Sequence, residues 1–161
     1  MSTINRIFTP EDAHHLAAYL HEGQTDKTGN PYIGHLRRVA SYVGDEESRI
    51  VAYLHDSIED TGVTAEELES VYMVPAHLTE AVVVLTRTKG ISHEEYYTKI
   101  RAHRLALEVK LADLADNTDP ARRSGLDEKT IERLARKYDE AYRHLGVDAS
   151  DGDLRRSNGL S

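Results

Sequence analysis

The segment 54–61, Leu-His-Asp-Ser-Ile-Glu-Asp-Thr, gathers side chains that could bind a metal or move a proton. On a helix, residues three and four apart are neighbours, so Asp56 lies beside both Glu59 and Asp60. His55 likewise lies beside Glu59. Crowded carboxylates repel one another, and the repulsion costs most where the groups are partly buried. A divalent cation at the centre of the cluster would supply the compensating charge.

The same segment has a plain structural interpretation. A His-Asp pair most often marks an exposed helix end, and Glu59 and Asp60 come just before Thr61-Gly62, where a helix could stop. Acidic side chains at a helix C-terminus, however, oppose the helix dipole. The two acids therefore break a local rule without a structural gain, as functional sites often do. From the spacing alone, a metal site and a helix terminus are both open.

Two other segments could complete a coordination shell. His35 lies in segment 31–40 and Asp113 in segment 109–117, each next to apolar positions of an amphipathic helix. Together with His55 and Asp56 they would offer two nitrogen and two oxygen ligands. This set leaves room for water, which suits a catalytic Mn²⁺, Fe²⁺ or Zn²⁺ better than a closed structural zinc site. Such a metal lowers the pKa of bound water and polarises a phosphoryl oxygen.

These side chains must be positioned by helices, because apolar residues recur at three-to-four spacing along most of the chain. We expect about eight helices: residues 10–22, 32–43, 45–60, a short helix from 64, then 75–85, one from 92, 104–117 and 127–145. Residues 82–85 could form a strand by propensity. A helix is favoured there because Pro75 precedes them and no partner strand is evident. The predicted fold class is therefore all-α, a helical bundle.

Composition excludes several classes of protein. The chain has 161 residues, which predicts one domain. Its net charge of −8 makes a duplex-DNA-binding protein a poor fit. The lack of cysteine excludes disulfides, Cys₄ zinc sites and thiol nucleophiles. No apolar run approaches the ~20 residues that span a bilayer, and no signal-peptide pattern is present, so we expect no membrane association and a cytoplasmic location. A homo-oligomer is compatible with the sequence.

Three ordered motifs give the chain its resemblance to a known family. They are G-x-P-Y-I-x-H at 29–35, H-D-x-x-E-D-T at 55–61 and K-L-A-D-x-x-x-N at 110–117. The chain resembles the HD-domain metal-dependent phosphohydrolases, and more narrowly the RelA/SpoT-type alarmone hydrolases and their small single-domain relatives. The resemblance implies a helical HD hydrolase domain over residues 1–145. Residues 146–161 are polar and aperiodic, so we expect a flexible tail there. The resemblance also implies one Mn²⁺, with ligands matching His35, His55, Asp56 and Asp113.

The resemblance implies hydrolysis of a small-molecule nucleotide, the release of the 3′-pyrophosphate from an alarmone of the stringent response. Glu59 and Asp60 match the pair that family members use to position and activate the attacking water. Residues that could contact the substrate are Lys27, Tyr32, Lys110, Asn117 and Tyr138. A solvated surface charge is the alternative for each lysine, and a helix C-cap is the alternative for Asn117.

The chain departs from the family pattern where the base is recognised. Guanine-specific relatives read Gln-x-Arg-Lys in the substrate loop, whereas this chain has Asp26 in place of the arginine. After Asn117, Thr118-Asp119-Pro120 replaces the familiar Met-Arg-Thr. The resemblance therefore leaves (p)ppGpp and the adenosine alarmones (p)ppApp as candidate substrates. Alternatives are an HD nucleotidase or phosphatase for other nucleotides, a catalytic antitoxin to an alarmone-synthesising toxin, and a non-catalytic nucleotide-binding module.

Overall fold

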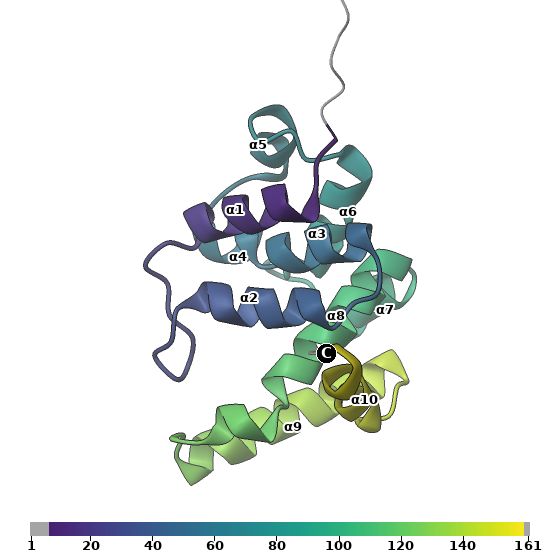
Figure 1. Ribbon diagram of the computed structural model, residues 1–161. Helices are drawn as coiled ribbons and strands as arrows, with labels where there is room; N and C mark the ends of the chain where they lie inside the picture. Colours follow the sequence, from purple (N-terminus) through teal and green to yellow (C-terminus); the bar gives the residue numbers. More distant parts are fainter. Residues whose placement is uncertain (1–6, 160–161) are drawn as a thin grey trace, which may run out of the picture.

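The protein is an all-α bundle, as predicted (Figure 1). The computed structural model describes residues 7–159, and within them no strand occurs. An isolated antiparallel bridge joins Thr25 and Pro31. The elements are α1 (Pro10–Leu20), α2 (Tyr32–Ser41), α3 (Glu46–Leu54), α4 (Ser57–Thr61), α5 (Ala65–Ser70), α6 (Ala76–Leu85), α7 (His93–Arg101), α8 (Arg104–Asn117), η1 (Pro120–Arg123), α9 (Glu128–Leu145) and α10 (Ser150–Gly159).

Helix starts follow the capping signals in the sequence. Thr9 caps α1 by accepting a hydrogen bond from the Asp12 N–H, and Thr64 caps α5 by accepting one from the Glu67 N–H. In both pairs the acidic side chain accepts a hydrogen bond from the backbone N–H of the threonine, which completes a capping box. Residues 82–85 form the last turn of α6, so the helical interpretation of that apolar run is confirmed.

The prediction of one helix over residues 45–60 is wrong, because the chain breaks into α3 and α4 at His55 and Asp56. Two side chains compete for carbonyls at the end of α3. The His55 Nδ1–H donates to the carbonyl of Ala52 (2.6 Å), and the Ser57 hydroxyl donates to that of Leu54 (2.6 Å). Such local bonds offer the backbone an alternative to the helical ladder. The break aims His55 and Asp56 toward the interior of the bundle.

Helices α3 and α8 form the centre of the bundle. Helix α3 packs against α1, α2, α6 and α8, and α8 also contacts α2, α6, α7 and α10. Most of α8 is buried, including Val109, Ala112 and the acidic residues Asp113 and Asp116. Since charged groups are rarely buried without partners, the two aspartates mark the place where the core becomes a polar site.

The expectation of a loosely ordered tail after residue 145 is wrong for the described part, because residues 150–159 form α10, which lies along α8 (Figure 1). Ion pairs hold this helix in place of an apolar stripe, and Leu154 stays exposed. The Arg155 guanidinium donates to both carboxylate oxygens of Glu108, at 2.8 and 3.1 Å. The spacing of apolar residues does not predict a helix that is held by ion pairs, so the sequence does not indicate α10. Residues 160–161 of the predicted tail lie outside the described residues.

None of the helices that the structure describes has the length and apolar character needed to cross a membrane.

Candidate active site

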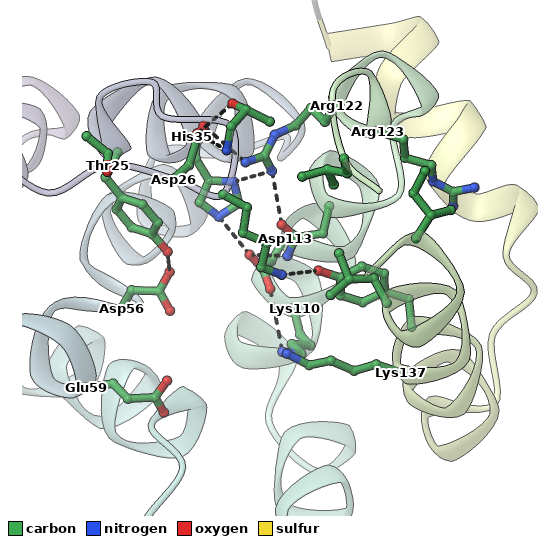
Figure 2. Close-up of a pocket in the computed structure, with 18 residues that line it drawn as sticks. Thr25, Asp26, His35, Asp56, Glu59, Lys110, Asp113, Arg122, Arg123 and Lys137 are labelled. Carbon is green, nitrogen blue, oxygen red and sulfur yellow. Dashed lines mark hydrogen bonds and ion pairs between the residues drawn. The ribbon is translucent and has the colours of Figure 1, made fainter. Parts of the chain in front are cut away.

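Four side chains from three parts of the chain converge beneath a pocket between α2, α4, α8 and α9. Figure 2 shows the three of them that line the pocket, His35, Asp56 and Asp113. His35 comes from α2, His55 and Asp56 from the turn between α3 and α4, and Asp113 from α8. One ligand atom from each lies within 4.8 Å of the others. The two imidazoles and the Asp113 carboxylate are buried, and Asp56 is half-buried. The structure therefore brings together the four residues that the sequence proposed as metal ligands.

The hydrogen bonds around these imidazoles fit a bound cation. The Nδ1–H of His55 donates to the Ala52 carbonyl, and the Nδ1 of His35 lies 2.6 Å from Asp116 Oδ2. With the proton on Nδ1, each Nε2 carries a lone pair. Both Nε2 atoms face Asp113 Oδ1, at 3.0 Å from His35 and 3.3 Å from His55. Lone pairs facing a carboxylate need a proton or a metal between them, so this donor set suits a divalent ion.

The pKa shifts of the cluster residues also fit a bound cation. Burial alone would lower the pKa of His55, but the carboxylates of Asp56 and Asp113 outweigh it and raise that pKa well above the usual value. Burial would raise the pKa of Asp113, but hydrogen bonds from the two imidazoles and the nearby Lys110 charge hold it well below its usual range. The site therefore stabilises ionised carboxylates next to a positive charge, as a metal site must.

Asp116 lies directly behind this cluster and is fully buried. In addition to the contact with His35, it accepts hydrogen bonds from Arg38 Nε (2.7 Å) and Arg122 Nη1 (3.0 Å). Hydrogen bonds from His35 and Arg38, with the positive charge of Arg122, outweigh burial and lower the pKa of Asp116. A carboxylate that holds the far nitrogen of a ligating histidine fixes its tautomer and raises its basicity.

Glu59 and Asp60 point to different places. Glu59 lines the pocket, and its Oε1 accepts a hydrogen bond from the Arg87 N–H at 2.8 Å. In Figure 2 its carboxylate is directed toward the open space beside Asp56. Asp60 is absent from the pocket lining, and its Oδ2 accepts a hydrogen bond from Gln24 Nε2 at 3.1 Å. The structure thus separates the two acids that the sequence treats as a pair.

The pocket has a volume of about 280 Å³ and is lined by cationic side chains in one part and by apolar side chains in another. Cationic side chains line the pocket: Lys27, Lys110, Arg122, Arg123 and Lys137. In Figure 2 the Arg123 side chain is directed away from Asp113. An apolar wall from the α9 side faces the cationic side chains: Leu126, Ile131 and Leu134. The chain as a whole carries a net charge of −8, so a local concentration of cations stands out and favours an anionic ligand at this place. The apolar wall suits a flat, less polar group.

All five residues predicted to contact substrate line this pocket. The Lys27 ammonium donates to the Tyr138 hydroxyl at 3.0 Å, and the Tyr32 hydroxyl donates to Asp56. Lys110 lies 3.5 Å from Asp113 Oδ2. On the same carboxylate, Oδ1 accepts a hydrogen bond from the Asn117 amide at 3.3 Å.

The loop between α1 and α2 forms one side of the pocket and is tied to three other elements. Gln24 contacts Asp60 in α4, and Lys27 contacts Tyr138 in α9. Asp26 pairs with Arg122 of η1 at 3.3 Å. An aspartate in place of the arginine of guanine-specific relatives brings a negative charge to the substrate loop. Its side chain is only 4% exposed and is turned toward Arg122, so this charge is compensated within the protein.

Sequence reasoning missed several residues of the site. From the sequence, Arg38 and Arg122 could steer anions or be solvated surface charges, and Asp116 has no evident role. In the structure both arginines hold Asp116. A helical-spacing argument could have found two of them. Asp116 follows Asp113 by three residues, and Arg38 follows His35 by three, so each shares a helix face with a proposed ligand. Arg122 and the apolar wall carry no comparable local signal.

An all-helical bundle with a His-Asp pair at a helix break, and a second histidine and aspartate opposite it, defines the class of HD-type metal-dependent hydrolases. Comparison with known families agrees, since the pattern described as HD domain matches residues 13–148. The chain therefore belongs to the HD-domain family.

Several named proteins are similar in sequence to most of this chain. The bifunctional (p)ppGpp synthase/hydrolase SpoT of Escherichia coli K12 is 32% identical over 90% of this chain and 23% of its own length. A GTP pyrophosphokinase of Myxococcus xanthus is 36% identical over 74% of this chain and 17% of its own. A guanosine-3′,5′-bis(diphosphate) 3′-pyrophosphohydrolase of Vibrio cholerae is 35% identical over 78% and 19%. The chain thus spans about a fifth of the length of these relatives.

One solved structure matches over nearly the whole chain. It belongs to a metazoan ortholog of SpoT described as hydrolysing ppGpp, and it superposes with a TM-score of 0.72 at 21% identity. The match covers 97% of this chain and 95% of the other. At that identity the likeness establishes the helical HD fold.

Proposed function

We propose that this protein is a metal-dependent hydrolase that removes the 3′-pyrophosphate from alarmone nucleotides, with (p)ppGpp as the first substrate to test. One observation carries the proposal. The His35, His55, Asp56 and Asp113 cluster lies at the floor of a pocket that is cationic around the floor and apolar on the α9 side. A pyrophosphate would lie at the cationic floor and a nucleobase against the apolar wall. The names of the curated relatives support this choice of substrate.

The metal we propose is Mn²⁺, held by the two Nε2 atoms and by the Asp56 and Asp113 carboxylates. A mixed nitrogen and oxygen donor set with open positions suits this ion. When bound, it supplies positive charge to a phosphoryl oxygen and lowers the pKa of a water molecule. Zn²⁺ and Fe²⁺ also accept such donors, so activity with each ion is part of the test.

The surrounding residues have distinct tasks in this mechanism. Glu59 accepts a proton from the water that attacks phosphorus, because its carboxylate lines the pocket beside Asp56. Lys110 and Lys27 bind the phosphate oxygens and offset the negative charge that develops on them. The new P–O bond to the water oxygen forms as the P–O bond to the 3′-oxygen of the ribose breaks. The 3′-oxygen takes up a proton from solvent to become a hydroxyl, and pyrophosphate leaves with the water oxygen. Asp60 acts indirectly, through Gln24 and the loop between α1 and α2.

Because Asp26 replaces the arginine of guanine-specific relatives, (p)ppApp is a second candidate substrate. With an aspartate at this position, the loop has no guanidinium that could stack on guanine. The Asp26 carboxylate itself is bound by Arg122 and by Thr28. We propose that the enzyme tolerates or prefers adenine. Since either substrate is a nucleotide of the cell interior, we place the enzyme in the cytoplasm.

A substrate panel tests the proposal. Purified protein with Mn²⁺ is incubated with ppGpp, pppGpp, ppApp, GMP and AMP, and released pyrophosphate and orthophosphate are measured separately. Pyrophosphate from the 3′-pyrophosphorylated nucleotides supports the proposal. Orthophosphate from the monophosphates alone would favour a general HD phosphatase. The Asp113→Asn variant is the control, because it removes one ligand while preserving the size of the side chain.

A further inference from the structure

Arg122 reaches from η1 to two separate parts of the site. Its Nη2 lies 3.3 Å from Oδ2 of Asp26 in the loop between α1 and α2. Its Nη1 lies 3.0 Å from Oδ2 of Asp116 in α8 and 3.1 Å from Oδ1 of Asn117. The Arg122 side chain is 17% exposed, and the two carboxylates are 4% and 0% exposed. The guanidinium is therefore an almost buried bridge between two nearly buried carboxylates.

The Asp26 side of the bridge shapes the pocket loop. Oδ1 of Asp26 accepts hydrogen bonds from the Thr28 N–H (2.9 Å), the Thr28 hydroxyl (2.6 Å) and the Asn30 N–H (3.1 Å). Those bonds close the turn that leads to the bridge between Thr25 and Pro31. Oδ2 is left for Arg122. One carboxylate thus folds the turn with one oxygen and docks it on η1 with the other.

The Asp116 side of the bridge reaches the metal-ligand cluster. The same Oδ2 that accepts from Arg122 lies 2.6 Å from Nδ1 of His35, while Arg38 holds Oδ1 at 2.7 Å. Loss of Arg122 would leave Oδ2 with only the His35 contact, in a fully buried place. Because the position of Asp116 sets the tautomer and direction of His35, a shift of this carboxylate changes the ligand directly.

We propose that Arg122 is a positioning residue that assembles the two halves of the site together, the pocket loop through Asp26 and the ligand His35 through Asp116. An arginine is required because its planar fork presents donors in two directions, whereas a lysine ammonium is a single compact charge. The loop half of this inference rests on the proposed function, since the loop matters there as a wall for the nucleotide. The His35 half rests only on the metal site.

The effect of Arg122 on the metal site is tested by measuring Mn²⁺ binding in the absence of substrate. Mn²⁺ is titrated with the 161-residue chain and free Mn²⁺ is followed by its EPR signal. Arg122→Ala is expected to weaken Mn²⁺ affinity about tenfold or more, the usual effect of losing an outer-shell partner. Arg123→Ala is the matched control, because it removes the neighbouring guanidinium of η1, which is directed away from Asp113 in Figure 2. Its Mn²⁺ affinity should stay within twofold of the wild type. Circular dichroism and thermal melting establish that both variants fold.

Arg122→Lys separates the two halves. A lysine keeps a positive charge near Asp116 but cannot reach Asp26 at the same time. Its Mn²⁺ affinity should return to within about threefold of the wild type, while KM for the nucleotide stays raised about three- to tenfold, as for the loss of one typical hydrogen bond. Asp26→Asn should raise KM similarly and leave both kcat and Mn²⁺ affinity nearly unchanged.

Two results would overturn the inference. One is wild-type Mn²⁺ affinity in a folded Arg122→Ala variant. The other is a loss of affinity in Arg123→Ala equal to that in Arg122→Ala, which would show a general charge effect. If the wild type binds Mn²⁺ but hydrolyses none of the alarmones, the proposed function fails while the Mn²⁺ titrations still decide the role of Arg122.

Discussion

His35 Nδ1 lies 2.6 Å from Asp116 Oδ2, and this contact fixes which nitrogen of the imidazole faces the cluster. Asp116 is fully buried and is held in turn by Arg38 and Arg122. A buried carboxylate is costly to build, and removing either arginine leaves its charge imperfectly compensated. The contact is therefore best understood as part of the metal site.

Replacing Asp116 by asparagine should weaken metal binding while preserving the shape of the side chain. The amide carries no charge, so it holds the His35 Nδ1–H less strongly and leaves Arg38 and Arg122 without a counter-charge. We expect Mn²⁺ affinity to fall about 10- to 100-fold. The measurement is a Mn²⁺ titration of folded protein, and an unchanged dissociation constant would contradict the orienting role of Asp116.

Removal of the metal should lower thermal stability, because a bound cation compensates the charges of Asp56 and Asp113. At a Mn²⁺ concentration one hundred times the dissociation constant, binding adds about 2.7 kcal/mol to the free energy of unfolding. For a domain of this size, the midpoint of thermal unfolding should rise by about 5–10 °C relative to EDTA. The Asp113→Asn variant should show little of this rise; identical melts of the wild type with and without Mn²⁺ would argue against a metal site.

Glu59→Gln should abolish most of the catalysis without weakening metal binding. The amide cannot take a proton from water, so kcat should fall about 10²- to 10⁴-fold. Asp60→Asn should act mainly on KM, because Asp60 touches Gln24 of the pocket loop. Steady-state pyrophosphate release measures both variants. Equal losses of kcat in the two variants would mean that Asp60 shares the chemical step.

The charge of Lys27 should make kcat/KM depend on pH. Desolvation of its ammonium group, with the nearby positive charges of Lys137 and Arg122, lowers the pKa of Lys27 to about 8 from its ordinary value of 10.5. As pH rises through 8, the folded protein loses this charge and binds a polyanion less well, so kcat/KM should decline. Lys27→Arg stays charged, and the decline near pH 8 should disappear in a pH–rate profile of that variant.

The same shift has a defined effect on stability. Between about pH 8 and 10.5 the unfolded chain keeps a proton on Lys27 that the folded protein releases. The contribution of Lys27 to the free energy of unfolding therefore becomes more favourable as pH rises through this range. Urea unfolding of wild type and Lys27→Arg across the window measures the difference, which should have the opposite direction to the change in kcat/KM.

Arg155→Ala should destabilise the bundle by removing the ion pair between α10 and α8. Two charge-assisted hydrogen bonds to Glu108 are lost, and we expect the free energy of unfolding in urea to fall by about 1–3 kcal/mol. Arg136→Ala, at an exposed position of α9, is the control and should change stability by less than about 0.5 kcal/mol. If the two variants unfold alike, α10 contributes little to the bundle.

Much of the fold could be predicted from the sequence because local signals and apolar periodicity agree. Thr9 and Thr64 mark helix starts by their side-chain oxygens, and the stretch 104–117 coincides with α8 at both ends. The errors fall where side chains compete with the backbone or with solvent. His55 and Ser57 end α3 by bonding its carbonyls, and Arg155 holds a polar helix by ion pairs. Neither kind of contact appears in the periodic pattern of apolar residues.

For the site, the sequence by itself determined the types of ligand, since the motifs containing His35, His55, Asp56 and Asp113 set the donor atoms and the family. Only the tertiary structure decided how they meet and what surrounds them. It separated Glu59 from Asp60, paired the Asp26 carboxylate with Arg122, and placed Arg122 beside Asp116. The physical reason is that donor chemistry belongs to single residues, whereas charge compensation in a buried site depends on side chains brought together from distant parts of the chain.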